Sequence, residues 1–332
     1  MKQNDIIIIN ENEISKLTDS KEAEIIEIIS EVYRLHNNGK SSLPHSIFLR
    51  FNDRPLDRII GLPAYLNMAQ GIAGIKWISS FPENIQRGIE RASAVMLIND
   101  MTTGKVRSVL EGSVISAKRT AASAALAAKM LHGNRNETIL GMIGTGRINH
   151  EIFLYLKHVF PKLSQLYLYD LSKERAFQFA EKIKSEKMNI RVVDSVDEIF
   201  AMTQLISVAT TAGEPYIHPD CIINANNTIL NISLRDFFPE TIEQAYNIVD
   251  DIDHVCREQT SIHLTEQKLS NRAFIRGTLA DVIDGHIIPR EKNKATIFSP
   301  FGLGVLDLAL GYYIEERARE EGLGIKVENF YS

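Results

Sequence analysis

From Thr138 onward the chain alternates short apolar stretches with helix-forming ones, and this alternation limits its possible folds more than any other feature. The expected strands are Thr138–Ile143, Leu166–Tyr169, Ile190–Val193, Leu205–Ala209, Thr228–Ile232 and Ile248–Val249. Helices of similar spacing lie between them, such as Asn149–Phe160, which Pro161 ends. Alternating strands and helices build a parallel sheet covered by helices on both faces. The sequence therefore predicts an α/β, doubly wound domain.

A glycine-rich turn follows the first of these strands, in the segment TILGMIGTGRINHE. Glycine allows the backbone to approach a pyrophosphate closely, and the N-terminus of the following helix offers it free N–H groups. The predicted contacts are Gly144, Thr145, Gly146, Arg147 and Ile148. The third small residue of the dinucleotide fingerprint is replaced by Asn149. Either the helix and strand pack less closely there, or a polar contact replaces their close approach.

An acidic residue stands at the distance that a dinucleotide site requires. Asp170 ends the strand LYLYD, 24 residues after Gly146. A carboxylate there hydrogen-bonds ribose hydroxyls and repels a 2′-phosphate, which favours NAD over NADP. Thr210 and Thr211, after a later strand, are expected near the nicotinamide end, and Asn231 is assigned to the same site. The prediction is a Rossmann-type NAD-binding domain over residues 121–304.

The rest of the chain has a different texture. Residues 1–120 combine an amphipathic helix, Glu22–Leu35, with strand-like pieces separated by Pro and Gly. A last helix, about Val305–Glu321, is expected to pack back on this part. Residues 1–120 with 305–332 are therefore predicted to form a second, α+β domain.

Composition excludes several classes of protein. The net charge of −5, without a basic block, argues against a nucleic-acid partner. The apolar run Ile6–Ile9 is too short for a signal peptide or a membrane helix, so no membrane association is expected. Cys221 and Cys256 are the only cysteines, and the histidines show no ligand spacing, so no metal site is predicted. We expect a cytoplasmic protein.

Five segments together resemble the ornithine cyclodeaminase/mu-crystallin family across nearly the whole chain. They are GMIGTGRINH, Gly74–Asn84, Arg91–Asp100, Ser116–Lys129 and Ser299–Gly311. GIKWI, ERASA and Asn231–Asp236 are most similar to the branch that acts in 2,3-diaminopropionate biosynthesis for siderophores or antibiotics. The resemblance implies a homodimer, with the non-Rossmann domain forming the contact.

The resemblance also assigns residues to the substrate. It implies that Arg50, Lys76 and Arg119 hold a substrate carboxylate, and Arg91 is a further candidate. Arginine suits this task because its planar fork matches a carboxylate with two hydrogen bonds. In the family a catalytic aspartate follows two glycines; here the equivalent segment is NISLRDFF, so Asp236 is the candidate general base. Lys76 and Asp236 are the predicted catalytic residues.

The activity implied is NAD-dependent oxidative hydrolysis of the amino-acid conjugate N-(2-amino-2-carboxyethyl)-L-glutamate. Its products are 2,3-diaminopropionate, 2-oxoglutarate and NADH. Three alternatives stay open: an ornithine cyclodeaminase, an imine or amino-acid reductase, and a crystallin-like protein that binds a cofactor and a small ligand without turnover. Two structural expectations accompany these. Trp77 is expected in the core, on the strand face opposite to Lys76, and Asp307 is expected to interact with a helix dipole.

Overall fold

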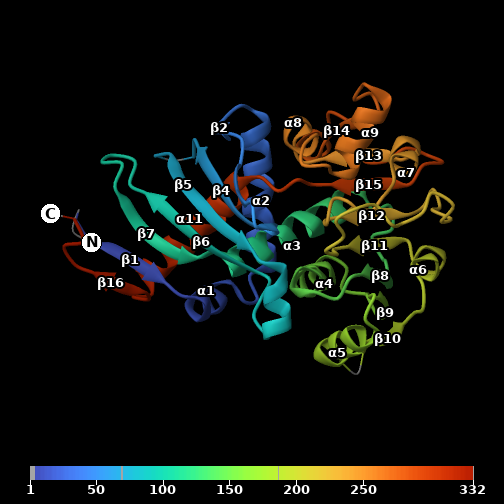
Figure 1. The fold of residues 1–332 in the computed structure, drawn as a ribbon, viewed down its shortest axis with the longest axis horizontal. Helices are drawn as coiled ribbons and strands as arrows, with labels where there is room; N and C mark the ends of the chain where they lie inside the picture. Colours follow the sequence, from blue (N-terminus) through green and yellow to red (C-terminus); the bar gives the residue numbers. More distant parts are fainter. Residues whose placement is uncertain (1–3, 69, 186, 332) are drawn as a thin grey trace. The chain divides into compact units, whose positions relative to one another are not determined.

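The computed structural model describes residues 4–68, 70–185 and 187–331. The chain divides into two compact units. The first unit consists of Met1–Arg119 and Leu303–Ser332, and the second of Thr120–Gly302. Helix α3 (Gly112–Leu131) includes one of the boundaries between them. Figure 1 shows the helices and strands of both units.

The first unit contains a mixed sheet in the order β16-β1-β7-β6-β5-β4-β2, with β3 beside β4. Its strands are β1 (Ile6–Ile9), β2 (Ser41–Ser42), β3 (Ile47–Phe51), β4 (Arg54–Leu66), β5 (Ile72–Ser80), β6 (Ala92–Asn99), β7 (Val106–Glu111) and β16 (Ile325–Val327). Its helices are α1 (Glu11–Thr18), α2 (Glu22–Asn37), the short η1 (Pro82–Arg87) and α11 (Gly304–Glu320). The central strands β4 to β7 pair antiparallel with their neighbours in sequence. This is the α+β arrangement that the sequence predicts.

Helix α11 covers one face of this sheet, which we call the inner face. It contacts β4, β5 and β6, and it packs against α2. A buried carboxylate fixes it to β7, because Arg107 Nε lies 2.9 Å from Glu315 Oε1 and Arg107 Nη2 lies 2.8 Å from Oε2. Arg319 also pairs with Glu315, so the charge on the fully buried Glu315 is neutralised.

The opposite, outer face of the sheet is apolar and exposed. Trp77 is 45% exposed there, so the expectation of a core tryptophan is wrong. Successive residues of a strand point to opposite faces, and Lys76 occupies the inner side, where its ammonium is paired with Asp307. Trp77 therefore points outward, over Gly61 and beside its cross-strand neighbour Val95.

The second unit is a parallel sheet in the order β10-β9-β8-β11-β12-β15-β13-β14 (Figure 1). Its strands are β8 (Ile139–Ile143), β9 (Gln165–Tyr169), β10 (Asn189–Val192), β11 (Leu205–Val208), β12 (Thr228–Asn231), β13 (Tyr246–Val249), β14 (Ile275–Thr278) and β15 (Thr296–Ser299). Its helices are α4 (Arg147–Val159), α5 (Lys173–Ile183), α6 (Val196–Met202), α7 (Pro239–Gln244), α8 (Ile252–Val255), α9 (Ser261–Leu269) and α10 (Leu279–Ile283). The first five strands of this unit, β8 to β12, are arranged in the spatial order 3-2-1-4-5 of a Rossmann fold. The predicted doubly wound architecture is confirmed.

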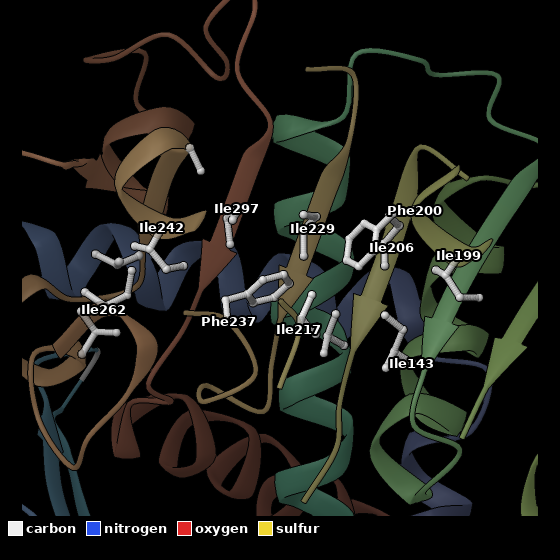
Figure 2. Packing of buried hydrophobic residues seen from close by; sticks show 14 of the residues in the cluster. Ile143, Ile199, Phe200, Ile206, Ile217, Ile229, Phe237, Ile242, Ile262 and Ile297 are labelled. Atoms are coloured by element: carbon white, nitrogen blue, oxygen red, sulfur yellow. The ribbon is translucent and has the colours of Figure 1, made fainter. Parts of the chain in front are cut away.

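The core of this unit follows the sheet. Figure 2 shows isoleucines from successive strands, Ile143, Ile206, Ile229 and Ile297, with the ring of Phe237 beside them. All five side chains are fully buried. Their packing holds the parallel strands together; in folds of this kind ligands bind at the carboxyl ends of such strands.

Candidate functional site

The turn between β8 and α4 is shaped for close approach of a ligand. Gly144 has φ +87°, and a Cβ on it would lie 2.3 Å from the carbonyl oxygen of Ala209. Both facts require glycine at that position. A Cβ on Gly146 would meet no atom within 4 Å, so the space in front of this residue is open. Gly146 is the N-cap of α4 and supplies no side-chain cap. The first N–H groups, including those of Arg147 and Ile148, are therefore oriented for an anion.

Of the two alternatives left open for Asn149, the structure shows the polar contact. Its Nδ2 donates to the carbonyl oxygens of Ile143 at 3.0 Å and Gly144 at 2.6 Å. Its Oδ1 accepts from Ser207 Oγ at 2.7 Å. Asn149 and Ser207 are both fully buried. The amide thus joins the end of β8, the start of α4 and strand β11, where the fingerprint has a small residue.

Asp170 lies beside the glycine turn, as the spacing predicts. Its Oδ2 accepts from the backbone N–H of Thr145 at 2.9 Å and from Thr145 Oγ1 at 2.7 Å. Its Oδ1 accepts from the Ser172 N–H at 3.0 Å. The carboxylate is therefore oriented by the turn itself. Leu171, which follows it, is 92% exposed; sequence reasoning passed over it, although an apolar residue directly after the acidic one is a readable signal.

Asp236 lies at the centre of a small hydrogen-bonded group. It is fully buried, and its two oxygens accept from Thr210 Oγ1 and Ser233 Oγ, each at 2.5 Å. Burial raises the pKa of Asp236 above its ordinary value, although the hydrogen bonds from Ser233, Thr210 and Tyr216 oppose that shift. Burial and then the charge of Asp236 raise the pKa of Tyr216, so its phenol stays protonated. Sequence reasoning missed Ser233 and Tyr216, which are brought to Asp236 by the fold.

The segment before Asp236 has Leu234 and Arg235 in place of the two glycines of the family pattern, and its backbone conformation is unfavourable for such residues. Leu234 has φ +77°, a left-handed conformation that a branched residue rarely adopts. Arg235 donates through Nε and Nη2 to the carbonyl oxygen of Glu258, at 3.1 and 2.6 Å. The guanidinium of Arg235 is therefore used to hold a neighbouring loop.

The other residues predicted at the cofactor differ in their surroundings. Asn231 is fully buried at the end of β12, and its Nδ2 donates to Ser299 Oγ at 3.1 Å. Within the described part of the chain, its Oδ1 has no hydrogen-bond donor. Thr211 is exposed in the loop after β11, next to Thr210. A buried acceptor without a donor is costly, so Asn231 Oδ1 is suited to receive a ligand N–H.

In the first unit, two cations share one buried carboxylate. Lys76 Nζ lies 2.7 Å from Asp307 Oδ1, and Arg119 Nε lies 3.1 Å from the same oxygen. Burial lowers the pKa of Lys76 to about 8; the charge of Asp307 opposes this and that of Arg119 adds to it. Burial opposes ionisation of Asp307, but the charges of Arg119 and Lys76 hold its pKa below the ordinary value. The group carries one net positive charge, which suits an incoming carboxylate.

The role of Asp307 as a counter-ion could not be predicted from the sequence. It lies in the first turn of α11, where a dipole interaction is available, as expected. Its main partners, however, are the side chains of Lys76 and Arg119, which are far away in the sequence. Lys76 Nζ also donates to Ser116 Oγ at 3.2 Å. The structure thus brings two of the four predicted substrate cations together, around a carboxylate that was not included in the prediction.

The other two predicted cations lie further along the same sheet. Arg50 is exposed on β3, with its guanidinium 5.3 Å from the ring centre of Phe48. Arg91 donates through Nη1 to Ser80 Oγ at 2.8 Å. Ser80 stands four residues beyond Lys76 on β5, about 13 Å along a strand. Arg50 and Arg91 are therefore placed at a different end of the sheet from Lys76.

Comparison with known proteins identifies the family. The family model described as "Ornithine cyclodeaminase/mu-crystallin family" matches residues 5–322. The chain belongs to this family. It is 27% identical over 330 residues to the N-((2S)-2-amino-2-carboxyethyl)-L-glutamate dehydrogenase of Staphylococcus aureus, covering 96% of this chain and 97% of that relative.

Solved structures of other proteins share the fold of this chain. The Δ1-pyrroline-2-carboxylate reductase of Thermococcus litoralis, in complex with NADH and L-proline, has a TM-score of 0.88 at 25% identity, covering 97% of this chain and 100% of that one. An archaeal alanine dehydrogenase dimer with bound NAD has a TM-score of 0.87 at 24% identity, covering 98% and 99%. Relatives of this one fold therefore act on different substrates, and the choice among them depends on the residues of the site.

Two features are absent from the residues that the structure describes. Among residues 4–68, 70–185 and 187–331, no three His, Cys, Asp or Glu side chains are grouped so that they could hold a metal ion. Over the same residues, no helix has both the length and the apolar character needed to cross a membrane.

Proposed function

We propose that this chain is an NAD-dependent dehydrogenase that oxidatively hydrolyses N-(2-amino-2-carboxyethyl)-L-glutamate to 2,3-diaminopropionate and 2-oxoglutarate. The observation that carries the proposal is the net positive Lys76–Arg119–Asp307 group, a buried site for a substrate carboxylate. The relative from Staphylococcus aureus has the same named activity. In a pathway, the product 2,3-diaminopropionate would supply siderophore or antibiotic assembly.

The residues of the second unit fit NAD. The open space at Gly146 and the uncapped start of α4 suit a pyrophosphate, and Asp170 suits the hydroxyls of the adenosine ribose. The exposed side chain of Leu171 is suited to pack on the adenine ring. Asn231 Oδ1 would accept from the carboxamide of the nicotinamide. When bound, NAD accepts the hydride that leaves the α-carbon of the glutamate moiety.

The chain's own groups position the substrate and move protons. In the proposed reaction Lys76 and Arg119 hold the α-carboxylate of the glutamate moiety. Oxidation of the C–N bond gives an imine, water adds to it, and the bond then breaks. Asp236, whose pKa is raised by burial, takes a proton from the substrate amine or from the attacking water. One conjugate, one NAD and one water yield the two products, NADH and a proton.

Parallel assays distinguish this activity from its alternatives. The purified chain is mixed with NAD and either the conjugate or ornithine, and NADH absorbance, 2-oxoglutarate and proline are measured. The proposal expects NADH and 2-oxoglutarate in equal amounts from the conjugate. Proline from ornithine without net NADH would instead indicate a cyclodeaminase. NADH oxidation by cyclic imines, or inactivity with both substrates, would favour a reductase or a ligand-binding protein and contradict the proposal.

The pKa of Lys76 predicts a pH dependence. The ammonium loses its proton as the pH rises through about 8, and with it the charge that attracts the substrate carboxylate. We expect kcat/KM to fall above pH 8, approaching tenfold per pH unit, because kcat/KM reports ionisations of the free enzyme. In the complex the bound carboxylate stabilises the ammonium, so the decline in kcat should begin at higher pH. A value of kcat/KM that is constant from pH 7 to 9.5 would contradict this role.

We also propose a homodimer formed through the outer face of the first unit's sheet. Apolar side chains are exposed over neighbouring strands of that face: Ile47, Trp77 and Val95 are 62%, 45% and 42% exposed. Exposed apolar side chains gathered on one sheet face are typical of an interface, and the archaeal relative is described as a dimer. Trp77→Asp should turn a dimer into a monomer in light scattering, whereas Leu171→Asp should not. A wild-type chain that is monomeric at micromolar concentration would contradict the proposal.

A further inference from the structure

A third arginine, Arg58, lies between the two that sequence reasoning placed at the substrate. In the antiparallel sheet Arg58 of β4 is directly opposite Arg50 of β3 on one side and Ser80 of β5 on the other. Directly opposite residues project from the same face. Ser80 in turn accepts the hydrogen bond from Arg91. Arg50, Arg58 and Arg91 therefore form one basic group, which we call the arginine end of the sheet.

Two of these arginines, Arg58 and Arg91, lie close enough for their charges to repel each other. Burial, and then the positive charge of Arg58, lower the pKa of Arg91, while Glu90 raises it only in part. Nε of Arg58 is buried and has no hydrogen-bond acceptor among the described residues. A buried donor of a charged group without an acceptor costs free energy comparable to a lost charge-assisted hydrogen bond. An anionic ligand at this position would remove both penalties.

The arginine end lies on the same sheet face as Lys76. Lys76 and Ser80 are both even-numbered residues of β5, so their side chains share the inner face. The position between them on β5 is Ile78, which is opposite Ile60 of β4. Along the inner face, the cation Lys76 is therefore followed by the apolar pair Ile78 and Ile60 and then by the arginine end. This pattern suits a ligand that has carboxylates at both ends and a hydrocarbon part between them.

We propose that Arg58, together with Arg50 and Arg91, forms a second carboxylate subsite that selects substrates with a carboxylate remote from the one held by Lys76 and Arg119. The inference rests on the proposed function and narrows it, because it assigns the substrate to the di- or tricarboxylic class. Monocarboxylic amino acids such as alanine, proline or ornithine leave this subsite unfilled. Arg58 is then a residue of substrate specificity that touches the substrate.

The test compares Arg58→Gln with the wild type on three compounds. These are the conjugate, an analogue with a carboxamide for the glutamate side-chain carboxylate, and an analogue without the diaminopropionate carboxylate. We expect Arg58→Gln to lower kcat/KM for the conjugate by about 10–100-fold, mainly through KM. On the analogue that lacks the carboxylate bound by Arg58, the variant and the wild type should have the same kcat/KM. Arg58→Lys, which keeps the charge, should recover part of the loss.

An equal loss on all three compounds, or no loss on any, would overturn the proposal. Arg54→Gln is the matched control, because Arg54 is on the same strand, is 59% exposed and is paired with Asp57. A binding experiment separates the two hypotheses. Calorimetry with glutarate and butyrate on the NAD-loaded protein should show tighter binding of glutarate, and Arg58→Gln should abolish the difference.

The two experiments together distinguish a failure of the proposed function from a failure of the proposed subsite. If the conjugate is not turned over but the preference for glutarate depends on Arg58, the proposed function is wrong and the subsite stands. If the conjugate is turned over and Arg58→Gln resembles the wild type in both experiments, the function stands and the subsite is wrong.

Discussion

Asp236→Asn is expected to lower kcat by about 10²–10⁴-fold, the range for loss of a general base. Asparagine preserves the size of the side chain and one acceptor for the hydroxyls of Thr210 and Ser233, so the local structure should survive. Because burial raises the pKa of Asp236, the wild-type rate should decline at acid pH as the carboxylate becomes protonated. The residual rate of Asp236→Asn should lack that decline. Steady-state kinetics from pH 5 to 8 measure both effects.

NAD affinity provides the control for this variant. Asp236→Asn should bind NAD as the wild type does, and Asp220→Asn, whose side chain is 91% exposed, should alter neither rate nor affinity. If Asp236→Asn retained more than a tenth of the wild-type kcat, the assignment of Asp236 as the base would be wrong. A large loss of NAD affinity would instead show that Asp236 acts through the cofactor site.

Gly144→Ala is expected to reduce NAD affinity by at least 100-fold and to lower the thermal stability of the free protein. The methyl group would stand 2.3 Å from the carbonyl oxygen of Ala209, and alanine at φ +87° costs about 1–2 kcal/mol in conformation alone. The turn must shift, and the N–H groups of α4 shift with it. Fluorescence titration with NADH measures the affinity, and calorimetry measures the stability.

Gly146→Ala is the matched comparison, because it adds the same methyl group in open space. This variant should keep the wild-type melting temperature without ligand and lose only NAD affinity. Its thermal stabilisation by excess NAD should shrink accordingly, since that stabilisation follows the logarithm of ligand concentration over Kd. Normal NAD affinity in Gly144→Ala would contradict the pyrophosphate assignment.

Local patterns were sufficient to predict the doubly wound class and six of its eight strands, but not β14 or β15, which lies between β12 and β13 in the sheet. Most strands from β8 to β13 are short, mainly apolar runs, and the glycine turn and Asp170 are separated by a distance that is typical of the fold. These features depend on neighbouring residues in the chain. They could therefore be predicted without knowledge of the tertiary structure. The Asn149 contact could be inferred as one of two possibilities.

Contacts between residues far apart in the sequence could not be predicted in the same way. Asp307 is more than 180 residues from Arg119, and nothing in the sequence GVLDLAL shows that its carboxylate is a counter-ion. Trp77 was misplaced because an apolar ring on a strand fits a core and an exposed interface equally well. Arg58 received no assignment, since its relation to Arg50 and Ser80 depends on the register of three antiparallel strands.

The Asn149 amide also restricts how this sequence could be changed over time or by design. Consensus engineering would restore a small residue at position 149. That single change would leave the hydroxyl of Ser207 and the carbonyl oxygen of Gly144 in a dry interior, each without its present partner. The route back to the common fingerprint therefore passes through a less stable intermediate, unless Ser207 changes at the same time. Asn149 and Ser207 should be inherited, or replaced, as a pair.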